Sequence, residues 1–242
     1  MKRKSFKKYF NILFLFMVSL SVFLLANPSI DVMKQVGFAI ESGKQKDKPT
    51  IIVDAGHGGR DPGKVGINGA LEKDINLSIA LKLKKLLEQN DYNVIMIRED
   101  DSGLYSESDS NKKAVDMRKR VDIINNSNAV LAISIHQNSF TQESIKGAQV
   151  FYYSNSREGK EFAEIMQKQL KGTLQDGNKR MAKANDSYYM LKKTQCPIVI
   201  VECGYLSNHT EAALLIDGNY QEKMAFAIHL GLLSYLNSYS DK

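Results

Sequence analysis

Three of the most strand-like segments of the sequence lead to a side chain that could do chemistry. The run IIVDAG leads to His57, AVLAISI leads to His136 and PIVIV leads to Glu202. Two imidazoles and a carboxylate form a donor set suited to zinc, which in catalytic sites keeps three protein ligands and one position for water. Zinc bound in this way lowers the pKa of its water and polarises a carbonyl, which is what amide hydrolysis requires.

A fourth candidate, Glu72, follows the glycine-rich stretch GKVGINGAL and begins a segment with helical apolar periodicity. Taken alone, this glutamate is better explained as a favourable acid in a first helical turn, worth less than ~1 kcal/mol. The flexible loop from Gly58 to Gly69, however, would let the helix end fold back beside His57. Glu72 and Glu202 are therefore the candidates for the third ligand and the proton carrier.

The alternative for the histidines is a partly buried imidazole that only caps a strand end. His57 and His136 are two of four histidines, so coincidence is the less attractive explanation. Glu202 is the stronger candidate, because a carboxylate directly after an apolar strand is costly to bury without a metal or a proton-transfer task. His209, in SNHTEAA, and His229, in EKMAFAIHLGLL, are predicted to be structural.

Other kinds of site fit the sequence less well. The segment GGRDPGK has the spacing of a phosphate-binding loop, but Val65 stands where Ser or Thr should bind magnesium, and Pro62 interrupts the loop. A serine hydrolase would need a GxSxG segment, which the chain lacks. Cys203 could act as a thiol nucleophile with His136 or His209, although a cysteine just past a strand is more often inert packing.

These candidates need a fold that brings strand ends together. Strand-like apolar runs lie at 50–54, 93–98, 129–135, 148–153 and 197–202, and helical segments lie between or after them. Strands that are apolar throughout and separated by helices indicate a mainly parallel sheet covered on both faces. We predict one open α/β catalytic domain over residues 50–242, with its chemistry at the carboxyl ends of the strands.

The first 26 residues have the order of an export signal. Five basic side chains and no acid fall within the first eight residues, and the apolar stretch YFNILFLFMVSLSVFLLA follows. This order predicts a secretory signal peptide, with an uncleaved membrane anchor as the alternative. Residues 27–49 end in a lysine-rich run and are predicted to be a linker. The chain after residue 26 holds 28 of the 33 basic residues against 27 acidic ones, so no nucleic-acid partner is expected.

Four ordered blocks of the chain resemble the zinc-dependent N-acetylmuramoyl-L-alanine amidases of the type 3 family. They are IIVDAGHGGRDPG, GALEKDINLSIALKLKKLLE, RKRVDIINNSNAVLAISIHQNS and PIVIVECGYLSN, and the resemblance extends over residues 50–238. This family cuts the bond between N-acetylmuramic acid and the first residue of the peptidoglycan stem peptide, and its fold is a mixed sheet flanked by helices. The resemblance implies zinc ligands at His57, Glu72 and His136, a catalytic carboxylate at Glu202, and substrate-binding residues at Arg120, Asn138 and Arg180.

A short arrangement of signal segment and catalytic domain is similar to the sporulation members of this family, which trim spore-cortex peptidoglycan before muramic-δ-lactam is made. This similarity implies an exported protein of the cell wall or the forespore intermembrane space, with membrane contact only through its N-terminal segment. Because the chain shows no cell-wall-binding repeat, we expect an accessory protein that localises or activates it. A catalytically inactive peptidoglycan-binding module is the alternative function.

Overall fold

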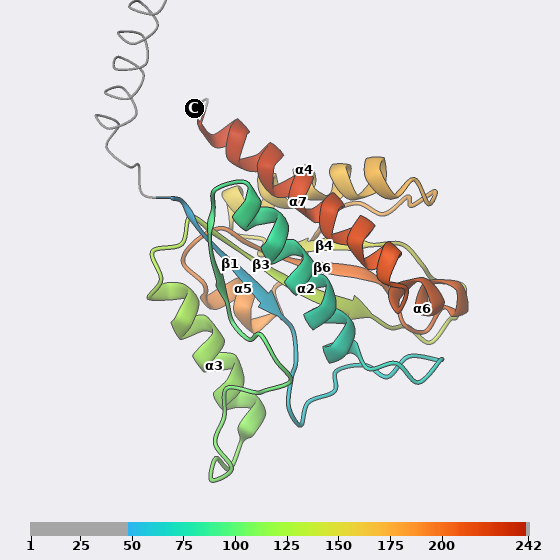
Figure 1. Cartoon of the computed structure of the whole chain (residues 1–242), viewed down its shortest axis with the longest axis horizontal. Coiled ribbons are helices and arrows are strands. Elements are labelled where there is room, and N and C mark those ends of the chain that lie inside the picture. The colour runs from blue at the N-terminus through green and yellow to red at the C-terminus, as the bar shows by residue number, and fades with distance from the viewer. Residues whose placement is uncertain (1–47, 241–242) are drawn as a thin grey trace, which may run out of the picture. The chain divides into compact units, whose positions relative to one another are not determined.

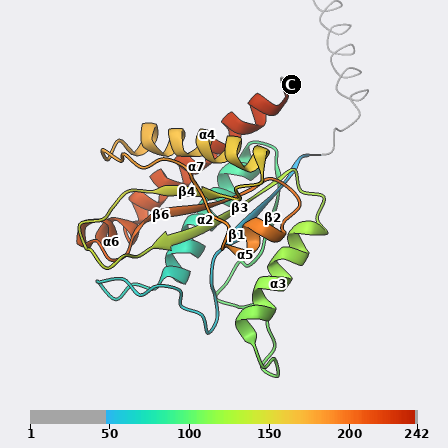
Figure 2. The ribbon, with the colours of Figure 1, turned by 180° about the vertical axis from the view of Figure 1, so that it is seen from behind.

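Six strands form the centre of the described part of the chain. A computed structural model describes residues 48–240, shown in Figure 1 and from behind in Figure 2. The predicted signal segment 1–26 and all of the predicted linker 27–49 except residues 48 and 49 lie outside the described residues. The strands are β1 (Thr50–Ala55), β2 (Asn93–Met96), β3 (Leu131–Asn138), β4 (Gln149–Tyr152), β5 (Lys183–Ala184) and β6 (Ile198–Tyr205).

The sheet is open and mainly parallel, as predicted. Its order is β2-β1-β3-β6-β4-β5, and the strands β2, β1, β3 and β6 pair in parallel. β4 pairs antiparallel with β6, and the short β5, which the sequence pattern does not predict, pairs parallel with β4. Because β1, β3 and β6 are parallel neighbours, their carboxyl ends meet at one edge of the sheet.

Strand β3 extends further than its apolar pattern predicts. The predicted strand ends at residue 135, whereas β3 continues to Asn138 and pairs with the end of β6. His136 lies opposite Glu202, and after a register shift Asn138 lies opposite Tyr205. His136 is thus within a strand rather than after it, because backbone pairing continues where the apolar residues stop.

Helices cover both faces of the sheet (Figures 1 and 2). One face carries α2 (Glu72–Gln89), α4 (Arg157–Leu174) and α7 (Gly218–Ser240), and the other carries α3 (Lys112–Asn125) and α5 (Tyr189–Lys193). The short α6 (His209–Leu215) follows β6. None of the helices within residues 48–240 is both long and apolar enough to cross a bilayer.

The apolar core under α3 and α5 gives way to ionisable groups at the strand ends. Ile198 and Ile200 of β6 belong to this core, and strand alternation places Glu202 on the same face. In β3 the same alternation leads from Ala132 to His136. The sheet therefore presents both candidate side chains on one face, at the edge where β1 also ends.

Candidate metal centre and active site

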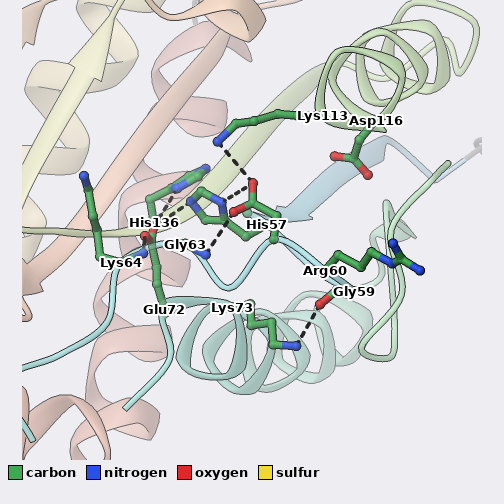
Figure 3. Close-up of polar contacts among 12 residues, drawn as sticks. His57, Gly59, Arg60, Gly63, Lys64, Glu72, Lys73, Lys113, Asp116 and His136 are labelled. Carbon is green, nitrogen blue, oxygen red and sulfur yellow. Dashed lines mark hydrogen bonds and ion pairs between the residues drawn. The ribbon is translucent and has the colours of Figure 1, made fainter. Parts of the chain in front are cut away.

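Three side chains that lie far apart in the sequence converge at the carboxyl ends of β1 and β3. One donor atom from each of His57, Glu72 and His136 lies within 4.8 Å of the others, so the group could hold a metal ion. Glu72 Oε1 is 3.2 Å from His57 Nε2 and 2.9 Å from His136 Nδ1. Figure 3 shows both rings and the carboxylate pointing toward one another. The structure thus brings the three predicted ligands together.

The carboxylate of Glu72 is fixed by the backbone around it. Glu72 is the first residue of α2 and is buried, its Oε2 accepts a hydrogen bond from Lys64 N at 2.7 Å, and its Oε1 accepts one from Gln137 N at 3.0 Å. Burial alone would raise the pKa of Glu72, but the hydrogen bonds from His136 and His57 outweigh it and hold the pKa well below its usual range. An ionised, immobile carboxylate is the form in which a metal is bound.

His57 stands in a backbone conformation that few non-glycine residues adopt, with φ of 63°. Its Nδ1 lies 3.0 Å from Asp61 Oδ2, and Asp61 also contacts Gly63 N at 3.1 Å and Lys113 Nζ at 3.2 Å. Burial alone would raise the pKa of Asp61, but the hydrogen bond from His57 lowers it to about 2. A carboxylate partner on Nδ1 leaves Nε2 as the ring nitrogen available to a metal beside Glu72. Sequence analysis missed Asp61, for which the four-residue spacing from His57 is the only signal.

Two glycines let the ligands approach one another. A side chain at Gly56 would overlap the ring of His136, and a Cβ at Gly63 would lie 2.6 Å from Glu72 Oε2. Gly63 also has φ of 69°, a conformation that glycine adopts without a steric cost. The loop that has the spacing of a phosphate-binding loop therefore makes room for the ligand group.

Glu202 lies next to His136 in the neighbouring strand but has fewer partners. Tyr188 donates a hydrogen bond to Glu202 Oε1 at 3.3 Å, whereas Oε2 is buried without a hydrogen-bond partner among the described residues. Burial raises the pKa of Glu202 above its usual range. A buried carboxyl group with a raised pKa beside a metal-ligand group is suited to accept and return a proton.

One cavity of about 300 Å³ is lined by His57, Glu72, His136 and Glu202 together. Asn138, which is predicted to bind substrate, also lines this cavity. The two imidazoles and one carboxylate match the donor set of catalytic zinc sites, whereas magnesium and calcium prefer oxygen ligands alone. The donor chemistry of the residues present therefore fits zinc.

Arg120 lies next to the candidate site and is held by several polar partners. It does not line the cavity described above but lines an adjoining one that shares His57 and His136 with it, and its side chain is 2% exposed. Its guanidinium forms ion pairs with Asp54 and Asp116 and donates hydrogen bonds to the carbonyls of Ala55 and His57. These contacts give Arg120 a supporting role at the backbone of His57, and its substrate-binding role stays a prediction.

Arg180 lies in a second cavity, which shares no lining residue with the first. Its guanidinium is 4.6 Å from the centre of the Tyr205 ring and donates hydrogen bonds to Lys146 O and Gln149 Oε1. Gln149 lies opposite Glu202 in the β4–β6 pair. Gln149 therefore lies between Arg180 and the cavity that Glu202 lines, and the substrate-binding role of Arg180 stays a prediction.

The remaining candidates lie apart from the cavity. Cys203 is fully buried, and burial raises the pKa of its thiol, which is the opposite of what a thiolate nucleophile needs. The side chain of His209 is exposed, 3.7 Å from Glu143, and His229 is buried in α7. None of the three lines the catalytic cavity.

Comparison with known proteins agrees with this chemistry. The family model described as N-acetylmuramoyl-L-alanine amidase matches residues 51–234, a range that contains all four candidate residues. The germination-specific N-acetylmuramoyl-L-alanine amidase of Bacillus subtilis (strain 168) is 39% identical over 194 residues, which are 79% of this chain and 81% of that protein.

Solved structures of two relatives share the fold. The CwlD amidase from Clostridioides difficile, solved in complex with the GerS lipoprotein, matches with a TM-score of 0.77 and 44% identity, over 79% of this chain and 100% of that one. The N-acetylmuramoyl-L-alanine amidase from Clostridium difficile 630 matches with a TM-score of 0.71 and 29% identity, over 80% of this chain and 99% of that one. Sequence, sheet topology and site geometry agree, and the chain belongs to the N-acetylmuramoyl-L-alanine amidase family.

Proposed function

We propose that the protein uses zinc, held by His57, Glu72 and His136, to hydrolyse the amide bond between N-acetylmuramic acid and L-alanine of peptidoglycan. The observation that carries this proposal is the convergence of three donor atoms within 4.8 Å, in the same cavity as a buried carboxylate. Membership of the amidase family supports the bond and the substrate. The donor chemistry supports the metal.

Each side chain has a definite task in this reaction. Bound zinc supplies a Lewis acid that polarises the carbonyl and makes water a better nucleophile. Glu202 accepts a proton from the attacking water and returns it to the departing alanine amine. Its partnerless Oε2 is the atom free to do so. Tyr188, which contacts the other oxygen, keeps the carboxylate in place.

The test is mass spectrometry of muropeptides incubated with the full-length, zinc-loaded protein. We expect release of intact stem peptides with new alanine amino termini, and loss of this release after chelation. Peptidoglycan binding without any new amino terminus would instead identify the chain as an inactive binding module. Glu202→Gln is the matched control, because it keeps the shape of the side chain and the zinc ligands but removes the base.

We further propose that the substrate is spore-cortex peptidoglycan and that the reaction precedes formation of muramic-δ-lactam. The similarity to a germination-specific amidase supports this setting. Cortex from a strain that lacks the protein should then contain no muramic-δ-lactam, and complementation with Glu202→Gln should not restore it. Cortex with a normal lactam content in the deletion strain would assign the enzyme to another part of the cell wall.

We also propose that the protein is exported and works with an accessory protein. The basic and apolar order of residues 1–26 supports export. A related amidase forms a complex with a lipoprotein, which supports a partner of that kind. A pull-down from sporulating cells with the full-length protein as bait should recover one specific lipoprotein, and recovery of none would count against this part of the proposal.

A further inference from the structure

The three successive carbonyls at the end of β1 are held by side chains from other segments. Arg98, after β2, donates to the carbonyls of Ala55 at 2.9 Å and Gly56 at 3.1 Å, and Asn76 of α2 donates to Gly56 at 3.0 Å. Arg98 and Asn76 are both buried. The turn that delivers His57 is therefore clamped from the side of α2 before the chain reaches the ligand itself.

Arg120 of α3 completes this clamp from the other side of the sheet. It donates to the carbonyl of Ala55 at 3.0 Å and to that of His57 at 2.6 Å. His57 has φ of 63°, which is unfavourable for a residue with a side chain. A strained backbone persists only when its surroundings fix it, and Arg120 is the side chain that holds the carbonyl of the strained residue.

The guanidinium of Arg120 is itself fixed by two carboxylates. Asp54, which is 1% exposed, and Asp116 of α3 both form ion pairs with it, and Ser134 of β3 donates a hydrogen bond to Asp54. A planar guanidinium can make these contacts at once because its donors point in fixed directions, whereas a lysine ammonium is a single point of charge. The arrangement therefore connects β1, β3 and α3 directly to the backbone of a metal ligand.

We propose that Arg120 is a positioning residue that sets the metal affinity of the site by holding His57 in its left-handed conformation. This inference rests on the proposed zinc site and adds to it a residue that acts through the backbone of His57. It differs from the sequence-based prediction for Arg120, in which the guanidinium binds substrate. The two roles have different consequences: a positioning residue changes the affinity for zinc, and a substrate-binding residue changes the KM.

The test compares Arg120→Lys with the wild type in the full-length protein. The lysine keeps a positive charge beside Asp54 but lacks the second guanidinium nitrogen, which donates the hydrogen bond to the carbonyl of His57. We expect the zinc dissociation constant, measured by competition with a chelator and corrected for the folded fraction, to rise by about 10–100-fold, as for other outer-shell partners of metal ligands. At zinc concentrations that saturate both proteins, the KM for muropeptide should stay within about twofold of the wild type.

Arg118→Lys is the matched control, because Arg118 is exposed on the same helix and should leave the zinc affinity unchanged. A wild-type affinity in folded Arg120→Lys would overturn the inference, and a raised KM with unchanged zinc affinity would restore the substrate-binding role. If Arg120→Lys does not fold, Asp116→Asn removes one of the two ion pairs more gently. An unchanged zinc affinity in Asp116→Asn would then overturn the inference. A wild-type protein that binds no zinc would instead refute the proposed function.

Discussion

The two halves of the catalytic cavity are built in opposite ways. On the side of β1 and α2, two of the three candidate ligands are held by neighbours: both oxygens of Glu72 accept backbone hydrogen bonds, and His57 is fixed through Asp61 and its own carbonyl. On the side of β6, Glu202 has one hydrogen bond within residues 48–240, from Tyr188, and its second oxygen has no hydrogen-bond partner there. A ligand must stay in place, whereas a proton carrier must have an oxygen free to react. The held side chains lie on the side of β1 and α2, and the carboxyl group with a free oxygen lies on β6.

The largest effect is expected from the side with few partners. Glu202→Gln should lower the rate of stem-peptide release by about 10²–10⁴-fold, since general acid–base catalysis supplies that much. The zinc content, measured by elemental analysis, should stay near one per chain because the ligand group is separate. Loss of zinc together with activity would show that Glu202 belongs to the ligand side, and the comparison would fail.

The ligand side should respond first in its metal content. Glu72→Gln removes the carboxylate on which both imidazoles converge, so its zinc dissociation constant should rise by more than about 100-fold, beyond the effect of losing an outer-shell partner. Activity should follow zinc occupancy and recover in part when zinc is added. Tight zinc binding by this variant would mean that the metal, if any, lies elsewhere.

The crowding of the ligand side can be tested with two glycines. Gly63→Ala places a Cβ against Glu72, whereas Gly69, with φ of 81°, has open space around it. Both substitutions should lower the free energy of unfolding by about 1–2 kcal/mol because alanine is strained in this conformation. Only Gly63→Ala should also weaken zinc binding in a chelator titration. Equal zinc affinities in the two variants would show that the ligands have room to adjust.

The buried carboxylate of Glu202 should also lower the free energy of unfolding when it is ionised. Because burial raises the pKa of Glu202, ionising it costs free energy in the folded protein; this cost is absent below the pKa of the unfolded chain and grows as the pH rises toward the folded value. Without metal at pH 7, Glu202→Gln should therefore be more stable than the wild type. Denaturant unfolding at pH 7 and pH 4 should show this difference only at the higher pH.

The smallest effect is expected at Tyr188. Tyr188→Phe removes the hydrogen bond to Glu202 Oε1, which lowers the pKa of Glu202 against the larger effect of burial. Activity at neutral pH should fall a few-fold, in line with the loss of about 1 kcal/mol. The acid limb of the kcat/KM profile should move to higher pH. A distant variant, Tyr92→Phe, should leave the profile unchanged.

The fold followed from the sequence because its signals are local. The runs at 50–54, 129–135 and 197–202 are apolar at nearly every position, whereas a strand with one solvent-exposed face would alternate with polar residues. This pattern predicts a sheet covered on both faces. The two-residue β5 has no such signal, since it forms only by pairing with β4. The continuation of β3 through His136 depends in the same way on a partner strand.

Parts of the site were less accessible to sequence analysis. Asp61 and Tyr188 each stand in a loop or at its edge, and their types are common in such places. The substrate-binding role of Arg120 is implied by the family resemblance alone. Its ion pair with Asp54 joins positions 66 residues apart, and local sequence patterns do not predict a contact at that separation.

The sequence by itself determined the set of chemical groups and the strands that carry them: two imidazoles, two acids, and apolar runs that must be buried. The tertiary structure alone decided which groups are held and which is left free. That distinction depends on backbone donors and ion pairs contributed by distant segments, and such contacts exist only once the strands have paired and the loop from Gly58 to Glu72 has folded back over their ends. Identity and order of residues are properties of the chain, whereas desolvation and hydrogen bonding are properties of its packing.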